Sequence, residues 1–182
     1  MPVNATNDKL GWLAPSFNLL DISDNYISLD KLKGDNGTVI AFICNHCPYV
    51  IAIAERLSFE AKELKKLSIN MIAIMSNDVE QYPEDSFDNM KLFAKKYDFE
   101  FSYLFDETQE VAKSYGAVCT PDIFGFNNKN LLCYRGRIDS GVMNSDQNKI
   151  DRELYNAMVK IKNDGIGPDK QLNSFGCSIK WK

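Results

Sequence analysis

Apolar positions along the chain follow two different periods. Short, almost wholly apolar runs stand at 38–43, 71–75 and 123–126, which is typical of strands buried on both faces of a sheet. In the intervening segments, apolar residues recur at every third or fourth position, the spacing of one helix face. Helices are therefore predicted over 48–67, 87–97 and 150–161. Strands that alternate with helices predict an α/β fold.

The remaining predicted strands are shorter. The run at 101–105 is predicted to be an edge strand, and 131–134 to pair with 123–126. The residues between this pair, 127–130, are Asn-Asn-Lys-Asn, which has the chemistry of a hairpin turn.

Helix ends are marked by glycines. A short helix at 108–115 is expected to end at Gly116, and the last helix at Gly165, because glycine accepts the left-handed backbone that follows a helix. Residues 166–182 are rich in Gly, Pro, Asn and Ser and are predicted to form a C-terminal tail. No linker, repeat or change in composition divides the chain, so one domain covering 1–182 is expected.

Composition narrows the class of protein. Hydrophobic residues make up 45% and charged residues 25% of the 182, which is ordinary for a soluble globular protein. The net charge of −4 and the lack of a basic stripe argue against a nucleic-acid partner. Residues 1–20 lack the pattern of a signal peptide, and no apolar run is long enough to cross a bilayer. A cytoplasmic protein with no membrane partner and five mostly reduced cysteines is therefore expected.

The candidate chemistry lies where the first apolar run passes into the first helix. Cys44 and Cys47 enclose His46, the single histidine of the chain, and Pro48 is expected to be the first helical residue. A helix N-terminus offers free N–H groups and the positive end of the helix dipole, and both favour a thiolate. Free cysteines often serve only as small buried hydrophobes. Two of them flanking a helix start favour redox chemistry instead.

Three further segments carry a family resemblance. Residues 11–17, Gly-Trp-Leu-Ala-Pro-Ser-Phe, resemble the G-x-x-A-P-x-F opening of peroxiredoxins and of membrane-tethered thiol reductases. Residues 116–121, Gly-Ala-Val-Cys-Thr-Pro, resemble their Y-G-V-x-x-T-P segment, and 134–139 their next strand. Together with the cysteine pair, the chain resembles the peroxiredoxin-like, or redoxin, branch of the thioredoxin superfamily over roughly residues 10 to 165.

This resemblance implies a thioredoxin fold. Such a fold has a central mixed β-sheet flanked by helices. A peroxiredoxin-type extension would precede it, and the tail at 166–182 would follow it.

Two registers of the cysteine pair are possible. In thioredoxins and glutaredoxins the attacking cysteine stands just before the helix, often followed by proline, and five residues after a strand phenylalanine. Phe42 and Cys47 have this spacing, and Cys47-Pro-Tyr-Val resembles the glutaredoxin Cys-Pro-Tyr-Cys. In the other register the thioredoxin CxxC begins at Cys44, which then attacks. Proline at the first helical position favours Cys47, but both registers remain open.

The chain also departs from the family patterns. The buried aspartate that thioredoxins carry six residues before the nucleophile is replaced by Ala41 or Thr38, depending on the register. The hydroxyl that peroxiredoxins place three residues before their nucleophile is replaced by Cys44 or Ala41. Weak peroxidase activity is therefore expected.

The resemblance assigns roles to residues outside the CxxC. Thr120-Pro121 would be a cis peptide, and the backbone of Thr120 would pair with an extended substrate. Cys119, just before this loop, is either a third redox thiol or an ordinary buried one. Cys177 is either a resolving cysteine or part of a tail packed down by its apolar residues. Cys133 is predicted to lie in the core.

His46 has two interpretations of its own. As a cation it would stabilise a neighbouring thiolate, because histidine titrates close to neutral pH. The alternative is a partly exposed loop imidazole without a catalytic role.

These observations favour a thiol–disulfide oxidoreductase that needs no cofactor and no metal. Its partners would be a protein or small-molecule disulfide or a peroxide, together with a thiol electron donor, and a homodimer is possible. One alternative is a thiol peroxidase. Another is a copper-binding or non-catalytic protein of the same fold, with Cys44, His46 and Cys47 as the only candidate ligands close in sequence.

Overall fold

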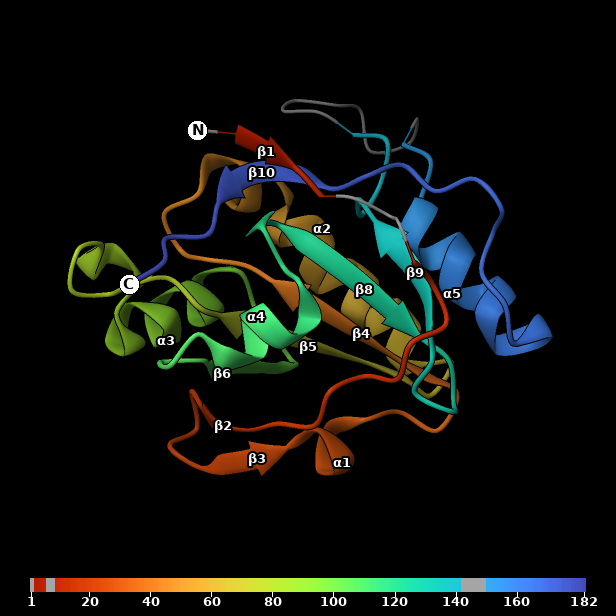
Figure 1. Ribbon diagram of the computed structural model, residues 1–182, viewed down its shortest axis with the longest axis horizontal. Helices are drawn as coiled ribbons and strands as arrows, with labels where there is room; N and C mark the ends of the chain where they lie inside the picture. Colours follow the sequence, from red (N-terminus) through yellow and green to blue (C-terminus); the bar gives the residue numbers. More distant parts are fainter. Residues whose placement is uncertain (1, 6–8, 142–149) are drawn as a thin grey trace.

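The computed structural model describes residues 2–5, 9–141 and 150–182 (Figure 1). Within this part of the chain, seven strands form a central sheet in the order β3-β2-β6-β5-β4-β8-β9. The strands β4, β5 and β6 run parallel, and the other neighbours pair antiparallel, so the sheet is mixed as predicted. Their bounds are β2 Asn18–Asp21, β3 Tyr26–Ser28, β4 Gly37–Phe42, β5 Ile69–Met75, β6 Ser102–Phe105, β8 Asp122–Phe126 and β9 Leu132–Gly136.

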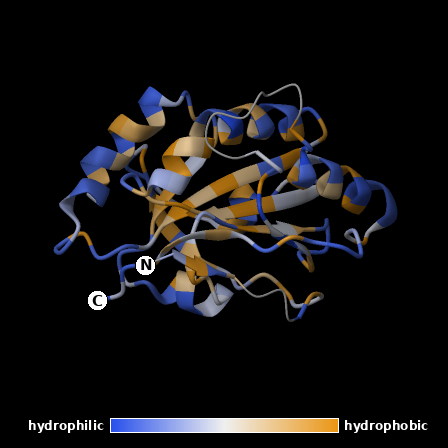
Figure 2. Ribbon diagram, turned by 90° about the horizontal axis from the view of Figure 1, so that it is seen from above, coloured by the Kyte–Doolittle hydropathy of each residue, from blue (hydrophilic) through white to orange (hydrophobic). Residues whose placement is uncertain are grey.

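Helices cover both faces of this sheet. Successive side chains of a strand point to opposite faces, and on β4 Val39 and Ala41 enter one core cluster while Ile40 and Phe42 enter the other. The first cluster includes apolar residues of α2, α3 and α5, and the second those of α1 and α4. Figure 2 shows largely hydrophobic strands between helices of mixed colour. The helices are α1 Leu29–Leu32, α2 Pro48–Lys65, α3 Phe87–Lys96, α4 Glu110–Tyr115 and α5 Glu153–Asp164, with a 3₁₀ turn η1 at Pro83–Asp85.

The predicted helix boundaries are confirmed where the local chemistry is strong. The helix α2 begins at Pro48, and Cys47 is its N-cap residue. Gly116 and Gly165 follow α4 and α5 with φ angles of 64° and 76°, so both take the left-handed conformation expected of them. Among the described residues, no helix combines the length and the apolar character that a membrane span requires.

The prediction that residues 101–105 form an edge strand is wrong. The strand β6 lies inside the sheet, because β2 pairs with it antiparallel and places Leu20 opposite Phe105. The β2–β3 hairpin that covers this edge was not predicted. Its strands have only four and three residues, too few for a periodic apolar pattern to be recognised.

A second, three-stranded sheet joins both ends of the chain to the middle of the sequence. Its order is β1 (Pro2–Asn4), β10 (Phe175–Ser178) and β7 (Cys119–Thr120), all antiparallel. Figure 1 shows β1 and β10 side by side above β8. The predicted tail therefore contains a strand. It is anchored by Ile179, which is 3% exposed and belongs to the second core cluster, the one that includes residues of α1 and α4.

Candidate active site

The turn between β4 and α2 places Cys47 at the start of a long helix. Cys47 has an extended backbone, with φ −68° and ψ 121°, and Pro48 fixes the first helical residue. Its sulfur makes no capping hydrogen bond to its own helix. Instead, the Cys47 thiol donates to the carbonyl oxygen of Thr120 at 3.1 Å.

The segment before β8 contacts both cysteines of the CxxC. The Thr120–Pro121 peptide is cis, as the resemblance implied. While the Thr120 carbonyl contacts Cys47, the Thr120 hydroxyl lies 3.3 Å from the sulfur of Cys44. Both cysteines are completely buried. Thr120 of the cis-proline loop thus contacts each sulfur with a different group.

The pKa values of the two thiols are shifted in opposite directions. A hydrogen bond from the Cys44 thiol lowers the pKa of Cys47 well below its ordinary range, and the thiol and backbone N–H of Cys177 lower it further. The same Cys44–Cys47 bond raises the pKa of Cys44, as do its burial and the charge of Asp85. The α2 N-terminus, acting through Val50, is a smaller influence on Cys47 than either cysteine. This environment favours a thiolate at Cys47 and a protonated thiol at Cys44.

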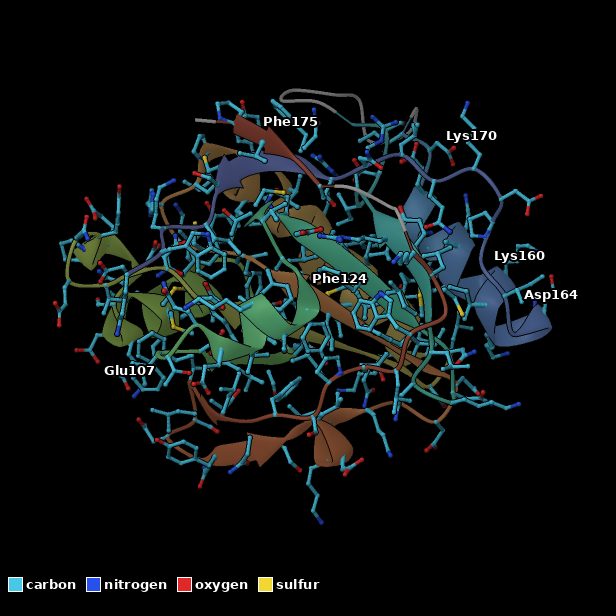
Figure 3. The ribbon with its side chains drawn as sticks, in the orientation of Figure 1. Glu107, Phe124, Lys160, Asp164, Lys170 and Phe175 are labelled. Carbon is cyan, nitrogen blue, oxygen red and sulfur yellow. The ribbon has the colours of Figure 1, made fainter. Side chains whose placement is uncertain are left out.

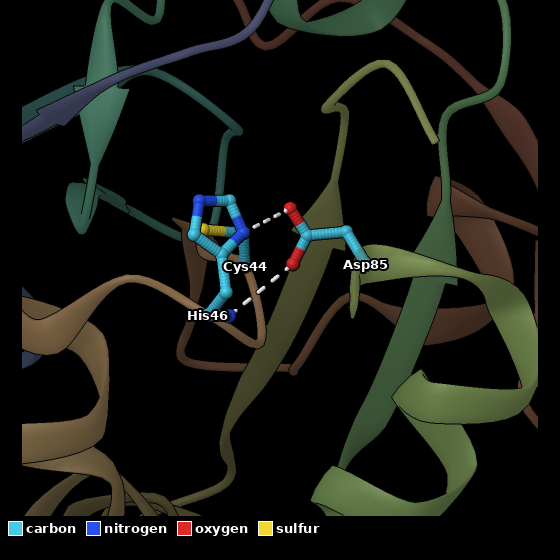
Figure 4. Close-up of side chains that lie close together, drawn as sticks. All are labelled: Cys44, His46 and Asp85. Atoms are coloured by element: carbon cyan, nitrogen blue, oxygen red, sulfur yellow. Dashed lines mark hydrogen bonds and ion pairs between the residues drawn. The ribbon is translucent and has the colours of Figure 1, made fainter. Parts of the chain in front are cut away.

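A buried carboxylate orders the loop between the cysteines. Asp85 is completely buried in η1 and accepts hydrogen bonds from the backbone N–H groups of Asn45 at 2.8 Å and His46 at 3.3 Å. Its second oxygen lies 2.7 Å from Nδ1 of His46 (Figure 4). The imidazole also stacks on Tyr82, with ring centroids 5.5 Å apart. His46 is therefore held by Asp85, although its side chain remains 27% exposed.

Sequence reasoning did not identify Asp85 as part of the site. It lies 38 residues beyond Cys47 in a polar segment, and nothing in its local pattern distinguishes it from other loop carboxylates. A further hydrogen bond, 2.7 Å from Asn77 Nδ2, links Asp85 to the end of β5. Asn77 in turn accepts the backbone N–H of Lys180 at 2.9 Å. The carboxylate that holds His46 is thus connected to the C-terminal segment.

The other cysteines occupy distinct positions. Cys177 lies on β10 opposite Thr120 and is only partly buried; burial and the neighbouring Cys47 raise its pKa to about 11. Cys119 is completely buried, its thiol lies 3.5 Å from the carbonyl of Pro121, and burial raises its pKa. Cys133 is 8% exposed in the core, as predicted. Of these three cysteines, Cys177 is the one that lowers the pKa of Cys47.

A cavity of about 470 Å³ opens beside the cis-proline. Its lining includes Tyr49 and Ile53 of α2, Pro121, Ile138, and Phe175 of β10. The Arg56–Asp139 ion pair, 2.7 Å between Nε and Oδ2, borders the same space. The cavity offers a mostly apolar surface next to the loop that contacts both sulfurs.

Within the described residues, one group of side chains has the spacing of a metal site. Ligand atoms of Cys44, His46 and Asp85 lie within 4.8 Å of one another. A structural zinc site takes four protein ligands, and a soft ion such as Cu(I) prefers sulfur to a carboxylate. The Cys44 sulfur already contacts the Thr120 hydroxyl, and His46 is already bonded to Asp85. The donor set therefore suits a hydrogen-bonded thiol site better than a metal centre.

Comparison with known proteins agrees with this geometry. The profile of the AhpC/TSA family matches residues 10–138. The chain belongs to this family. It is 32% identical over 117 residues to the chloroplastic peroxiredoxin Q of Populus jackii, an alignment that takes in 63% of this chain and 49% of that protein. The chain thus spans about half the length of the curated relatives it matches.

Solved structures extend the likeness to the whole chain. An uncharacterized conserved protein of Geobacillus kaustophilus is 41% identical, with a TM-score of 0.93 over 100% of this chain and 97% of that one. The thioredoxin domain of a thiol-disulfide oxidoreductase from Bacteroides vulgatus shares 16% identity and a TM-score of 0.64, over 85% of this chain and 99% of that domain. At that identity the likeness shows the fold alone, which is the thioredoxin fold that the sequence resemblance implied.

Proposed function

We propose that this redoxin is a thiol–disulfide oxidoreductase with Cys47 as its nucleophile and Cys44 as its resolving thiol. The observation that carries the proposal is the placement of two buried cysteines against one cis-proline loop, with Cys47 at the start of α2 facing the Thr120 carbonyl and Cys44 facing the Thr120 hydroxyl. The Cys47 thiolate would attack the substrate while Cys44 stays protonated until the second step, which is the division of roles that disulfide exchange requires.

The first step removes the interaction with Cys47 that keeps Cys44 protonated. The Cys47 thiolate attacks one sulfur of a substrate disulfide R–S–S–R′, forms Cys47–S–S–R and releases R′–S⁻. The hydrogen bond to Cys47 is the largest cause of the raised pKa of Cys44, and the mixed disulfide removes it. Cys44 then loses its proton more readily. The departing R′–S⁻ accepts that proton and leaves as R′–SH.

The second step closes the cycle. The Cys44 thiolate attacks the Cys47 sulfur, forms the Cys44–Cys47 disulfide and releases R–S⁻. An external thiol donor then reduces this disulfide by two further exchanges. The five cysteines of the described structure are free thiols, which corresponds to the reduced form in the proposed cycle.

The test is disulfide reduction with dithiothreitol as donor. Wild-type protein should reduce a small disulfide, Cys47→Ser should be inactive, and Cys44→Ser should stop at the mixed disulfide, which mass spectrometry detects as a mass increase on Cys47. Activity that survives in Cys47→Ser and disappears in Cys44→Ser would assign the nucleophile to Cys44. Metal analysis of protein purified in reduced form tests the copper-binding alternative separately.

A thiol peroxidase is the second candidate, because the curated relatives are named as peroxiredoxins. The hydroxyl of Thr120 lies beside Cys44, whereas its carbonyl faces Cys47. Cys47 thus has an acceptor where peroxide cleavage needs a donor to the departing oxygen. We expect slow peroxide reduction. Rapid consumption of micromolar hydrogen peroxide without disulfide reductase activity would reverse this ranking.

A further inference from the structure

The backbone edge expected to bind an extended substrate is already occupied. An extended peptide that adds to an exposed strand edge bonds to the N–H and C=O of the strand residues. In this chain β10 pairs with β7 and places Cys177 opposite Thr120, the residue before the cis-proline. The pairing continues outside the strands, where the Ile179 N–H donates to the Val118 carbonyl at 3.1 Å. The C-terminal strand thus takes the place of a substrate strand.

A glycine permits this close approach. A Cβ atom added to Gly176 would lie 2.0 Å from the Thr120 carbonyl oxygen and 3.0 Å from the nitrogen of Pro121. These contacts are to backbone atoms, which cannot rotate away as a flexible side chain would. Any other residue at 176 would force β10 away from the cis-proline loop.

The same strand covers the nucleophile. Cys47 is completely buried, and Cys177 of β10, which lies opposite Thr120, lowers the pKa of the Cys47 thiol. Phe175, at the start of β10, packs edge-to-face on Tyr49 with ring centroids 5.2 Å apart. Figure 3 shows Phe175 on β10 at the same end of the molecule as β1.

The end of the chain beyond β10 is also fixed. The Lys180 carbonyl accepts from Asp78 N–H and from Gln109 Nε2, both at 2.8 Å. The backbone N–H of Lys182 donates to Gln109 Oε1 at 2.9 Å. The strand is therefore held at Gly176, at the buried Ile179 and by polar contacts at the chain end.

We propose that β10 is an internal substitute for a polypeptide substrate and restricts this redoxin to small-molecule disulfides. The inference rests on the proposed function and adds the class of substrate to it. An extended protein segment can reach Thr120 and Cys47 only when β10 leaves the β7 edge. With β10 in place, the 470 Å³ cavity still brings a small group to Pro121 of the cis-proline loop, whereas neither active-site cysteine lines it.

The decisive variant is Gly176→Ala, because it displaces the strand without removing a thiol. We compare reduction of hydroxyethyl disulfide and of insulin by the full-length wild type and this variant. The wild type should strongly prefer the small disulfide. In Gly176→Ala the ratio of insulin to small-disulfide rates should rise by about tenfold or more, which corresponds to about 1.4 kcal/mol.

A matched control is Gly167→Ala. A Cβ there would lie 1.9 Å from the Cys133 carbonyl oxygen, an equally severe backbone clash in the same C-terminal segment, at a site away from the cis-proline loop. This control should leave the substrate ratio unchanged. An equal rise in both variants, or no rise in Gly176→Ala, would overturn the proposal.

A labelling experiment tests the strand independently of turnover. The rate of Cys47 alkylation by iodoacetamide is measured against pH in wild type, Gly176→Ala and Ile179→Ala, the last of which loosens the anchor without a clash. Displacement of β10 should raise the limiting rate, because Cys47 becomes exposed. It should also move the midpoint to higher pH, because the thiol and backbone N–H of Cys177 no longer lower the pKa of Cys47.

The two proposals fail in different ways. An unchanged limiting rate in both displaced variants refutes the role of β10, even if disulfide reduction is observed. Absence of disulfide reduction in every protein, together with faster labelling of Cys47 in the displaced variants, supports β10 as a cover and refutes the proposed function.

Discussion

At the scale of single residues, the neighbouring thiols of Cys44 and Cys47 shift each other's pKa in opposite directions. Their interaction lowers the pKa of Cys47 and raises that of Cys44, and the buried Asp85 carboxylate adds to the second shift. Low dielectric strengthens these interactions, because both sulfurs are shielded from water. The immediate neighbours of Cys47, Cys44 before all others, therefore favour its thiolate.

The first prediction concerns the titration of Cys47. Because the folded pKa is lowered, its thiolate should be present at about pH 6 to 7, below the ordinary thiol pKa of about 8.5, and should be lost only as the pH falls further. Ultraviolet thiolate absorbance should show this in wild type and not in Cys47→Ser. Alkylation at the same pH should modify Cys47 ahead of Cys133, whose pKa is raised by burial. If Cys44 is modified first, Cys44 is the nucleophile.

The second prediction concerns His46. If a protonated His46, held by Asp85, stabilises the neighbouring thiolate, His46→Ala should raise the pKa of the reactive thiol and make the site disulfide less oxidising. A tenfold change in the exchange constant appears as about 30 mV, or about 1.4 kcal/mol, in a redox titration. Asp85→Asn should act differently and lower the pKa of Cys44, because the charge that raises it is gone. An unchanged thiol pKa in His46→Ala would mean that the imidazole has no part in stabilising the thiolate.

At the scale of elements, the cis-proline loop separates the two steps of the proposed cycle. The Thr120 hydroxyl contacts only Cys44 and lowers its pKa, whereas the carbonyl contacts Cys47. The side chain and the backbone of one residue therefore affect different sulfurs.

The third prediction follows from this separation. Thr120→Val keeps the shape and the carbonyl but removes the hydroxyl, so the pKa of Cys44 should rise further and resolution should slow by about tenfold, while the titration of Cys47 changes little. Quenched-flow mass spectrometry should then detect accumulation of the Cys47 mixed disulfide. A shift of the Cys47 titration as large as that of Cys44 would contradict separate roles for the hydroxyl and the carbonyl.

At the scale of the whole molecule, the C-terminal segment is part of the folded unit. It pairs with β1 and β7, buries Ile179 and bonds through Lys180 to the residues that follow β5. The segment predicted as a tail is thus connected to the core, to the cis-proline loop and to the Asp85 network.

The fourth prediction measures this connection. Ile179→Ala should lower the free energy of unfolding by about 2–5 kcal/mol, the usual cost of truncating a buried isoleucine. Leu172→Ala, at a 41% exposed position in the same segment, should cost about 0.5 kcal/mol or less. Urea denaturation of both variants tests the difference. Equal stability of Ile179→Ala and wild type would mean that the segment is not part of the cooperative unit.

The sequence by itself determined the features whose causes lie within a few residues. Pro48 fixes the start of α2, Gly116 and Gly165 fix helix ends, and the apolar run at 71–75 fixes a buried strand. The cysteine pair and Thr120-Pro121 carried the family resemblance, and with it the cis peptide that the structure contains. These signals are strong because backbone stereochemistry and side-chain period act locally.

Only the tertiary structure decided which distant groups meet at the sulfurs. Asp85 reaches His46 across 39 residues, and Cys177 lies opposite Thr120 across 57, from strands of four and two residues that carry no periodic pattern. The same limit made β6 appear to be an edge, because β2 joins it from more than 80 residues away. Such pairings depend on backbone groups that every residue possesses and on burial that exists only after folding. For that reason the acidity of Cys47 and the strand that covers it follow from the fold.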